Sequence, residues 1–143
     1  MRVSVGPFEE HHYPGTRALW ERTPGVGLSD ADEPQAISSF LRRNPNTCFA
    51  ATAGAQVVAT ILCGHDGRRG LIHHLVVAPE LRRQGLGRQL LVAGLRALRA
   101  EGIDKCHLLV FRNNAEGIAF WRSVSAVERT DLLLFSLPTE SAA

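Results

Sequence analysis

The sequence predicts one α/β domain, and three observations lead to that prediction. Short runs rich in Val, Ile, Leu, Cys and Ala alternate along the chain with longer segments whose apolar residues recur every three or four positions. This interleaving of strand and helix patterns is typical of a sheet covered by helices. The chain has 143 residues, of which 45% are hydrophobic, which suits one globular domain with its own core. We therefore expect residues 1–143 to form a single domain.

The first half of the chain predicts a short strand, two helices and a strand hairpin. Pro14 suits the first turn of a helix, and Thr23–Gly27, with its proline and two glycines, ends that helix. Acidic residues before Pro34 and an apolar stripe after it predict a second helix, which Asn44 ends. Apolar runs on either side of Gly54 predict the hairpin. The expected elements are a strand at Arg2–Val5, helices at Pro14–Arg22 and Pro34–Arg43, and strands at Thr47–Ala53 and Gln56–Gly64.

The second half predicts a strand, a long helix, another strand, a second helix and a final pair of strands. The long helix follows residue 87, carries leucines on one side and arginines on the other, and ends at Glu101-Gly102. The expected bounds are Leu71–Ala78 and Cys106–Phe111 for the strands, Ala115–Val124 for the second helix, and Ala126–Arg129 with Leu132–Leu137 for the final pair.

An arginine-rich glycine loop joins the strand that ends at Ala78 to the long helix. Gly85 and Gly87 leave backbone N–H groups open to a phosphate, and the positive end of the helix dipole points at the same place. Arg82, Arg83 and Arg88 add charge-assisted hydrogen-bond donors. This combination predicts a phosphate site.

The charge distribution favours the same interpretation. Residues 68–99 hold seven arginines and one acid, Glu80, a net charge of +6, so the rest of the chain carries −4 to give +2 overall. Fifteen of the sixteen basic residues are arginine, a bias that GC-rich coding alone would produce. That bias explains arginine in place of lysine, but it does not explain why acids avoid this one segment. A net charge of +2 gives no general case for nucleic acid.

Two common phosphate loops do not fit. A P-loop requires Gly-Lys followed by Ser or Thr, whereas Arg88-Gln89 follows the second glycine here. A dinucleotide loop requires a third glycine, where this chain has Leu90. A nucleotide-binding protein of either kind is therefore disfavoured.

The residues Arg82-Arg83-Gln84-Gly85-Leu86-Gly87 do fill the Arg/Gln-x-x-Gly-x-Gly/Ala pattern, and the loop resembles the acyl-CoA loop of the GCN5-related N-acetyltransferase (GNAT) superfamily. The surroundings of the loop extend the likeness, because Val-Val-Ala-Pro ends the preceding strand and a long amphipathic helix follows. Gly54–Gly70 resembles the hairpin and turn before the loop, and Arg112–Trp121 resembles the segment after the fifth strand. The resemblance covers Asn46–Leu137.

The resemblance implies a single-domain GNAT fold and a role for acetyl-CoA as co-substrate. The expected fold is a mixed, mostly antiparallel sheet of about seven strands with flanking helices, and a CoA cleft between the fourth and fifth strands. The backbone of Leu75–Val77 would pair with the pantetheine arm, and a bulge there would free the Val77 amide as an oxyanion donor. The implied cofactor-binding residues are Leu75, Val76, Val77, Arg82, Arg83, Gln84, Gly85, Leu86, Gly87, Arg88, Asn114 and Trp121.

The acceptor amine needs a base, because an amine such as that of lysine is mostly protonated at neutral pH. His73 is the candidate, since alternation along a strand places it on the same face as Leu75 and Val77. Its alternative role is that of a core histidine. His74 is then expected on the opposite face, packed or in solvent. Acids between residues 21 and 33 favour a cationic acceptor, although Asp32 and Glu33 also suit capping of the following helix.

Trp121 departs from the family pattern, since it stands where a tyrosine commonly protonates the departing thiolate. An indole N–H donates a hydrogen bond but is not an acid at neutral pH. Either the thiolate leaves without this acid, or water, Ser123 or Ser125 assists. Ser125-Ala126 also replaces the usual Gly-Phe, so a shift of the correspondence by about one residue stays open here.

These features predict an acyltransferase, namely an acetyl-CoA-dependent N-acetyltransferase that acts on an amine of a small molecule or peptide. The alternative is a non-catalytic acyl-CoA-binding or regulatory module, which Trp121 supports. Three widely spaced cysteines, Cys48, Cys63 and Cys106, favour reduced thiols in a cytoplasmic protein and no metal site. No apolar run reaches the length of a membrane span. The expected partners are therefore the amine acceptor and a second copy of the chain in a homodimer. Neither a nucleic acid nor a membrane is expected as a partner.

Overall fold

The computed structural model describes residues 2–141. Its internal contacts divide the chain into two compact units. The first unit ends at Phe111, and the second begins at Arg112. Each unit is described by itself.

The first unit is built on one five-stranded sheet whose strands follow the order of the sequence. The strands are β1 (Ser4–Pro7), β2 (Cys48–Ala53), β3 (Gln56–His65), β4 (Gly70–Val77) and β5 (Cys106–Leu108). β1 to β4 pair antiparallel, and β5 pairs parallel with β4. Mixed pairing of this kind was expected, and the antiparallel part accounts for most of the ladder.

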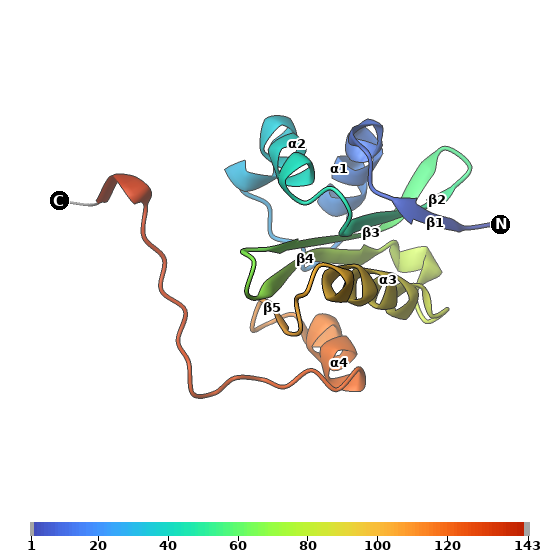
Figure 1. The fold of residues 1–143 in the computed structure, drawn as a ribbon. Coiled ribbons are helices and arrows are strands. Elements are labelled where there is room, and N and C mark those ends of the chain that lie inside the picture. Colours follow the sequence, from blue (N-terminus) through green and yellow to red (C-terminus); the bar gives the residue numbers. More distant parts are fainter. Residues whose placement is uncertain (1, 142–143) are drawn as a thin grey trace. The chain divides into compact units, whose positions relative to one another are not determined.

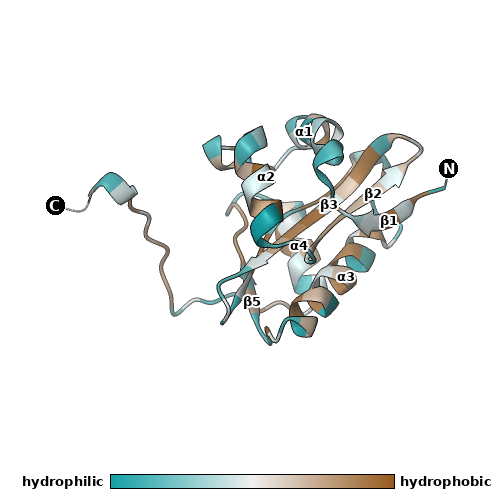
Figure 2. Ribbon diagram, turned by 45° about the horizontal axis from the view of Figure 1, so that its top comes forward, coloured by the Kyte–Doolittle hydropathy of each residue, from teal (hydrophilic) through white to brown (hydrophobic). Residues whose placement is uncertain are grey.

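Helices cover both faces of this sheet. The helices are α1 (Tyr13–Glu21), α2 (Pro34–Arg43) and α3 (Leu86–Ala100), with short 3-10 turns η1 (Glu10–His12), η2 (Asp30–Asp32) and η3 (Pro79–Leu81). α1 and α2 lie on one face, and α3 lies on the other (Figure 1). β3 runs through the middle and is the most apolar strand (Figure 2), since eight of its residues are buried. Burial of this strand on both faces provides the core.

α3 approaches the sheet most closely at Gly94. A Cβ atom on this residue would lie 2.8 Å from Cys63 Sγ and 3.1 Å from Ile61 Cδ1, both on β3. The glycine therefore sets the depth at which α3 packs. Leu90 and Leu98, one turn away on either side, are almost fully buried on the same face of the helix.

β4 contains the bulge that the family resemblance implied, at His74 and Leu75 where Leu75–Val77 was expected. Thr60 pairs with Val76 and Leu62 pairs with His73, so His74 and Leu75 together face the single residue between Thr60 and Leu62 on β3. His74 has a φ of 46°. The extra residue reverses the alternation of faces, so the prediction that His73 shares a face with Leu75 is wrong.

The β4–β5 ladder is short. It joins Gly70–Ile72 to Cys106–Leu108 and ends there, so β5 is three residues long where six were predicted. From His73 to Val77, β4 has a strand partner only on the β3 side within the described part of the first unit. One edge of β4 is therefore open to pairing beyond Ile72.

The second unit contains α4 (Ala115–Ser123) and a terminal 3-10 turn, η4 (Thr139–Ser141). The side chain of Asn114 caps α4 by accepting a hydrogen bond from the Gly117 N–H at 3.0 Å. The predicted strands Ala126–Arg129 and Leu132–Leu137 are not formed, so the sheet has five strands and not seven. Apolar alternation favours an extended chain, but a strand also needs a partner edge, and Phe135 is 85% exposed.

The three cysteines are free thiols, and Cys48 and Cys63 lie in the core. Burial raises the pKa of the Cys48 thiol to about 11, so it stays protonated and unreactive near neutral pH. No helix within residues 2–141 has both the length and the apolar character that crossing a membrane requires.

We predict that Gly94→Leu destabilises the first unit by about 1–3 kcal/mol or more, because the added side chain has to displace Cys63 and Ile61. Val92→Leu on the exposed side of α3 is the matched control and should change the free energy of unfolding by less than about 0.5 kcal/mol. Urea unfolding of both variants gives the measurement. Equal stability of Gly94→Leu and the wild type would contradict the close packing of α3 on β3.

Candidate functional site

The glycine loop forms a sharp turn from the end of β4 into α3. Arg83 and Gly85 have φ values of 64° and 83°. These two left-handed residues turn the chain from the end of β4 into the start of α3. Gly85 is the N-cap of α3, which begins at Leu86. A Cβ atom on Gly85 would meet nothing within 4 Å. The predicted strand, loop and helix are confirmed, and the space above Gly85 is open to a ligand.

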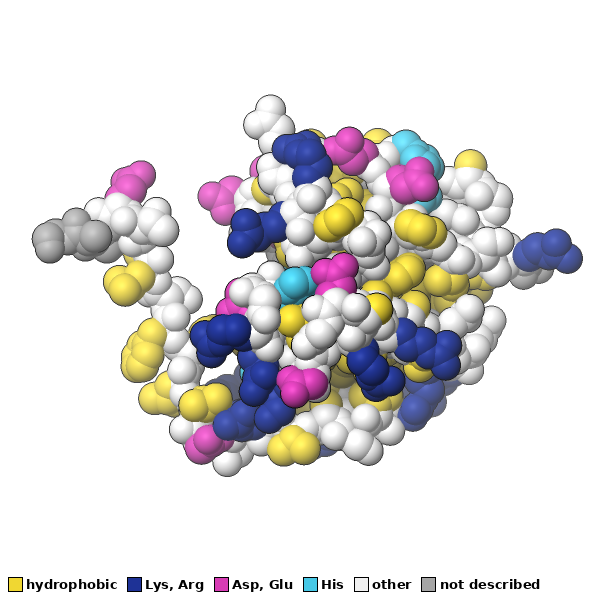
Figure 3. Space-filling model, in the orientation of Figure 1, with side chains coloured by type: hydrophobic (Ala, Val, Ile, Leu, Met, Phe, Trp, Pro, Cys, Tyr) yellow, Lys and Arg dark blue, Asp and Glu magenta, His cyan; other side chains and the backbone are white. Residues whose placement is uncertain are grey.

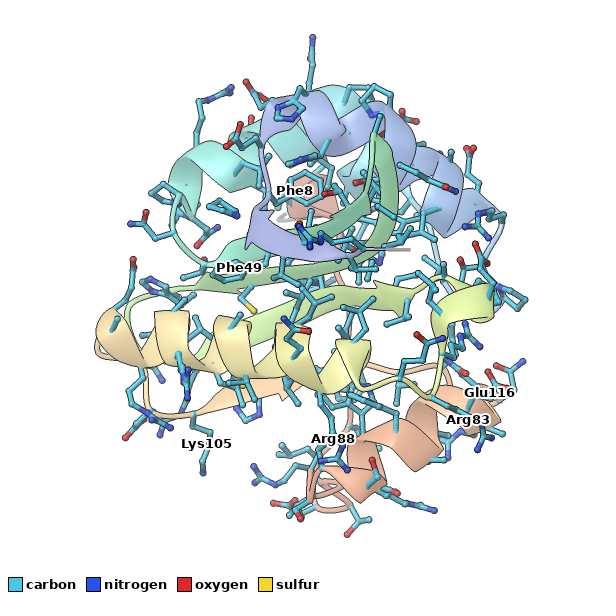
Figure 4. All side chains as sticks on the ribbon, turned by 90° about the vertical axis from the view of Figure 1, so that its right-hand side faces the viewer. Phe8, Phe49, Arg83, Arg88, Lys105 and Glu116 are labelled. Atoms are coloured by element: carbon cyan, nitrogen blue, oxygen red, sulfur yellow. The ribbon has the colours of Figure 1, made fainter. Side chains whose placement is uncertain are left out.

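Basic side chains surround this loop. Figure 4 shows Arg83 in the loop and Arg88 on the first turn of α3, and Lys and Arg side chains gather on the α3 side of the molecule in Figure 3. The single acid of the segment, Glu80, accepts two hydrogen bonds of 3.1 Å from Arg22. This guanidinium lowers the pKa of Glu80 and offsets its charge. The loop therefore presents a positive surface to a phosphate.

The end of β4 leads directly into this surface. Ala78 N–H donates to Val58 O at 2.8 Å, and alternation along the strand then turns the N–H and C=O of Val77 away from β3. The Nε of Arg82 donates to Val77 O at 3.3 Å, which agrees with this direction. The Val77 N–H consequently points to the open edge of β4, as a donor to a bound carbonyl would.

The two histidines of β4 both face the layer of α1 and α2. The ring of His73 packs edge-on against Phe40 of α2, with centroids 5.7 Å apart. The ring of His74 stacks on Trp20 of α1 at 4.3 Å. Burial, followed by the charge of His74, lowers the pKa of His73. The prediction that the two side chains lie on opposite faces is wrong, because the bulge interrupts the alternation.

His74 forms a partly buried pair with Asp32, which lies 42 residues earlier in η2. His74 Nε2 is 2.7 Å from Asp32 Oδ1, and the two side chains are 16% and 10% exposed. The Ser29 N–H donates to the second carboxylate oxygen at 2.9 Å. Asp32 therefore caps η2, whereas the sequence suggested that it caps the helix after Pro34, for which Glu33 is the N-cap. Asp32 also holds His74, which no local pattern in the sequence indicates.

The backbone of Asp32 is fixed as well. Tyr13 O–H donates to its carbonyl at 2.6 Å, and Arg17 Nη1 donates to the same oxygen at 3.2 Å. Both side chains come from α1. The short segment that carries the carboxylate is thus tied to the helix that packs on His74.

Asn114 and Trp121 belong to the second unit. Asn114 acts there as the N-cap of α4. Trp121 packs edge-on against Phe120, with ring centroids 5.1 Å apart. The first unit brings together the other predicted cofactor residues, which are Leu75–Val77 and Arg82–Arg88.

The hollow beside the loop is open and has a volume of about 710 Å³. Gly85, Arg88 and Arg96 line one side of it, and Val5–Pro7 with Phe49 line the other. It therefore lies between α3 and the strands β1 and β2. Residues of β4 and β5 line no part of it, so it is not the cleft that was expected between those strands.

Comparisons with known proteins agree on one family for this chain. A family model described as the acetyltransferase (GNAT) family matches residues 13–125. An acetyltransferase of Photorhabdus laumondii is 32% identical over 116 residues, which are 78% of each chain. An acetyltransferase of Pectobacterium atrosepticum is 27% identical over 123 residues, 85% of this chain and 86% of that protein.

Solved structures share the fold. Ard1 of Thermoplasma volcanium superposes with a TM-score of 0.75 at 19% identity, covering 87% of this chain and 82% of the other. The PaiA N-acetyltransferase of Thermoplasma acidophilum, solved in complex with coenzyme A, gives a TM-score of 0.74 at 16% identity, covering 87% and 89%.

We predict that Gly85→Asp abolishes acetyl-CoA binding, because it places a side chain and a negative charge in the open space above the loop. Gly67→Asp is the matched control, since Gly67 has a similar φ of 89°, is equally open and lies in the turn between β3 and β4. Calorimetry should give wild-type affinity for the control only. Unchanged affinity in a folded Gly85→Asp variant would exclude a phosphate site at the loop.

Proposed function

Because the chain belongs to the GNAT acetyltransferase family, we propose that it moves the acetyl group of acetyl-CoA to an amine of a small molecule or peptide. The observation that carries this proposal is the open, positively charged loop that follows β4. Beside it, the N–H of Val77, the last residue of β4, points to the unpaired edge of the strand. The matched residues 13–125 extend over both units, so we propose that the two units form one acetyltransferase domain.

Acetyl-CoA would bind along two parts of the first unit. The pyrophosphate would lie over Gly85, where backbone N–H groups, the start of α3 and the arginines supply positive potential. The pantetheine arm would run along the open edge of β4 and pair with the backbone of Leu75–Val77. The thioester oxygen would then accept a hydrogen bond from the Val77 N–H, which stabilises the oxyanion as it forms.

The acceptor amine has to lose its proton before it attacks. An imidazole on β4 suits this task, because its ordinary pKa of about 6.5 keeps it neutral at neutral pH. His73 is the residue that the sequence indicates. Its lowered pKa keeps it neutral over a wider range of pH, and an acid limb that it caused would lie below about pH 6.5.

Departure of the thiolate needs little help. A thiol with a pKa near that of cysteine, about 8.5, is a tolerable leaving group. Trp121 can donate a hydrogen bond but no proton. We therefore propose that water protonates the thiolate, with Ser123 or Ser125 as further donors. Beyond Trp121 itself, nothing in the described structure favours the non-catalytic module, and the matching relatives are named acetyltransferases.

We expect the wild-type protein to release free thiol from acetyl-CoA with at least one amine of a panel containing tyramine, spermidine, lysine and an alanyl peptide. Gly85→Asp should abolish the release, because the donor no longer binds, whereas Gly67→Asp should retain it. Absence of thiol release with every amine, together with tight acetyl-CoA binding, would contradict the enzymatic function.

We predict that Trp121→Tyr has activity equal to or higher than the wild type, because the phenol adds an acid at the position where the family usually carries one. The initial rate of thiol release with the best amine of the panel gives the measurement, and Trp121→Phe is the control without an acid. A lower rate in both variants would mean that Trp121 is needed for its shape.

A further inference from the structure

We propose that His74, positioned by Asp32, removes the proton from the acceptor amine. This inference rests on the proposed acetyl transfer and assigns its base to a different residue from the one that the sequence indicated. The pair is the one hydrogen-bonded histidine–carboxylate pair of the described chain in which both side chains are less than 20% exposed. Contacts of Trp20 and Thr60, described below, fix it in place.

The hydrogen bond to Asp32 selects the tautomer of His74. An ionised carboxylate only accepts hydrogen bonds, so Nε2 carries the proton and donates it across the 2.7 Å contact. The lone pair is consequently on Nδ1. This is the arrangement in which a carboxylate orients a general base and stabilises the imidazolium that forms when the base takes up a proton.

The Nδ1 atom of His74 is open to an acceptor. No hydrogen bond within residues 2–141 is recorded for it. The only described side-chain N or O atom that is both sealed from solvent and without a partner is Thr16 Oγ1. Nδ1 therefore keeps some exposure to solvent, although most of the side chain is covered.

The ring of His74 is held on its other sides. Trp20 stacks on it at 4.3 Å and is itself anchored by a 3.0 Å hydrogen bond from its Nε1 to Thr60 Oγ1. Thr60 Oγ1 in turn donates to His74 O at 2.9 Å. These contacts support a left-handed backbone conformation, φ 46°, that is unfavourable for a residue with a side chain. Such strain persists only where the surroundings determine it.

The bulge also places His74 next to the donor. His74 is followed immediately by Leu75–Val77, the segment whose open edge would bind the pantetheine arm. Its side chain faces the layer of α1 and η2, which contains the acids that favoured a cationic acceptor. An amine that enters from this layer would reach Nδ1 on one side and the thioester on the other.

The proposed reaction conserves atoms and charge. Nδ1 takes one proton from the ammonium form of the acceptor, and the nitrogen lone pair then attacks the thioester carbon. The carbon–nitrogen bond forms, the carbon–sulfur bond breaks, and the electron pair of the latter leaves with the thiolate. The second proton of the amine nitrogen passes through water to the thiolate. His74 finally releases its proton to solvent.

Four titratable or charged groups surround His74 in the structure. Asp32 of η2 accepts the hydrogen bond from Nε2, and His73 is the neighbouring residue on β4. Tyr13 and Arg17 of α1 bind the backbone carbonyl of Asp32. His73 has no hydrogen-bonded carboxylate among the described residues, so it lacks the group that would set its tautomer.

We expect His74→Ala to lower kcat/KM for thiol release at least about 10²-fold and to remove the acid limb of the pH profile. Added imidazole should restore part of the rate, which a purely structural role of the ring would not allow. Asp32→Asn should keep the fold and lower kcat, because His74 loses the carboxylate that sets its tautomer and orientation. Asp32→Glu should recover part of the rate.

His73→Ala should retain the acid limb, and His11→Ala, at an exposed site on η1, should match the wild type in all respects. The acetyl-CoA affinity of every variant, measured by calorimetry, should stay at the wild-type value. An unchanged limb in His74→Ala, or its loss in His73→Ala, overturns the role of His74 and leaves the acetyl transfer intact. Absence of thiol release from the wild type overturns both.

Discussion

The bulge in β4 determines the geometry of the rest of the site. One extra residue turns His74 to the same face as His73, toward α1 and α2, and the Val77 N–H lies at the open edge. Without it, regular alternation would direct His74 toward α3 and away from Asp32. The bulge is maintained by side chains of three elements, since Trp20, Thr60 and Asp32 each contact His74. The site therefore depends on the packing of α1 against β3 as much as on β4.

The opposite face of the sheet fixes the loop in a similar way. Gly94 allows α3 to lie close to β3, and α3 begins about two turns earlier at Leu86. Its first residues and Gly85 then meet the end of β4, to which Arg82 ties the loop. The proposed acetyl-CoA site is thus defined by close packing on the α3 face of the sheet. The proposed acceptor site is defined by hydrogen bonds on the face that α1 and α2 cover.

Much of this arrangement follows from local sequence patterns. The bounds of α2 and the loop between β4 and α3 depend on residues within a few positions of each other, and they were predicted. The strands after α4 were predicted from apolar composition and are not formed, because pairing depends on a distant edge. The face of His73 was wrong for a related reason, since a single inserted residue changes every later position without a clear mark in the sequence.

The pair of Asp32 and His74 was beyond sequence reasoning because its partners are 42 residues apart and each has an ordinary local role. Asp32 has a sufficient explanation as a cap, and His74 as a strand residue. Only the folded chain shows that the carboxylate has two oxygens in two different uses, one on the Ser29 N–H and one on His74. A buried carboxylate is costly unless it is fully hydrogen-bonded, and here the capping bond and the histidine together satisfy it. The stability of η2 and the tautomer of His74 are therefore linked through one side chain.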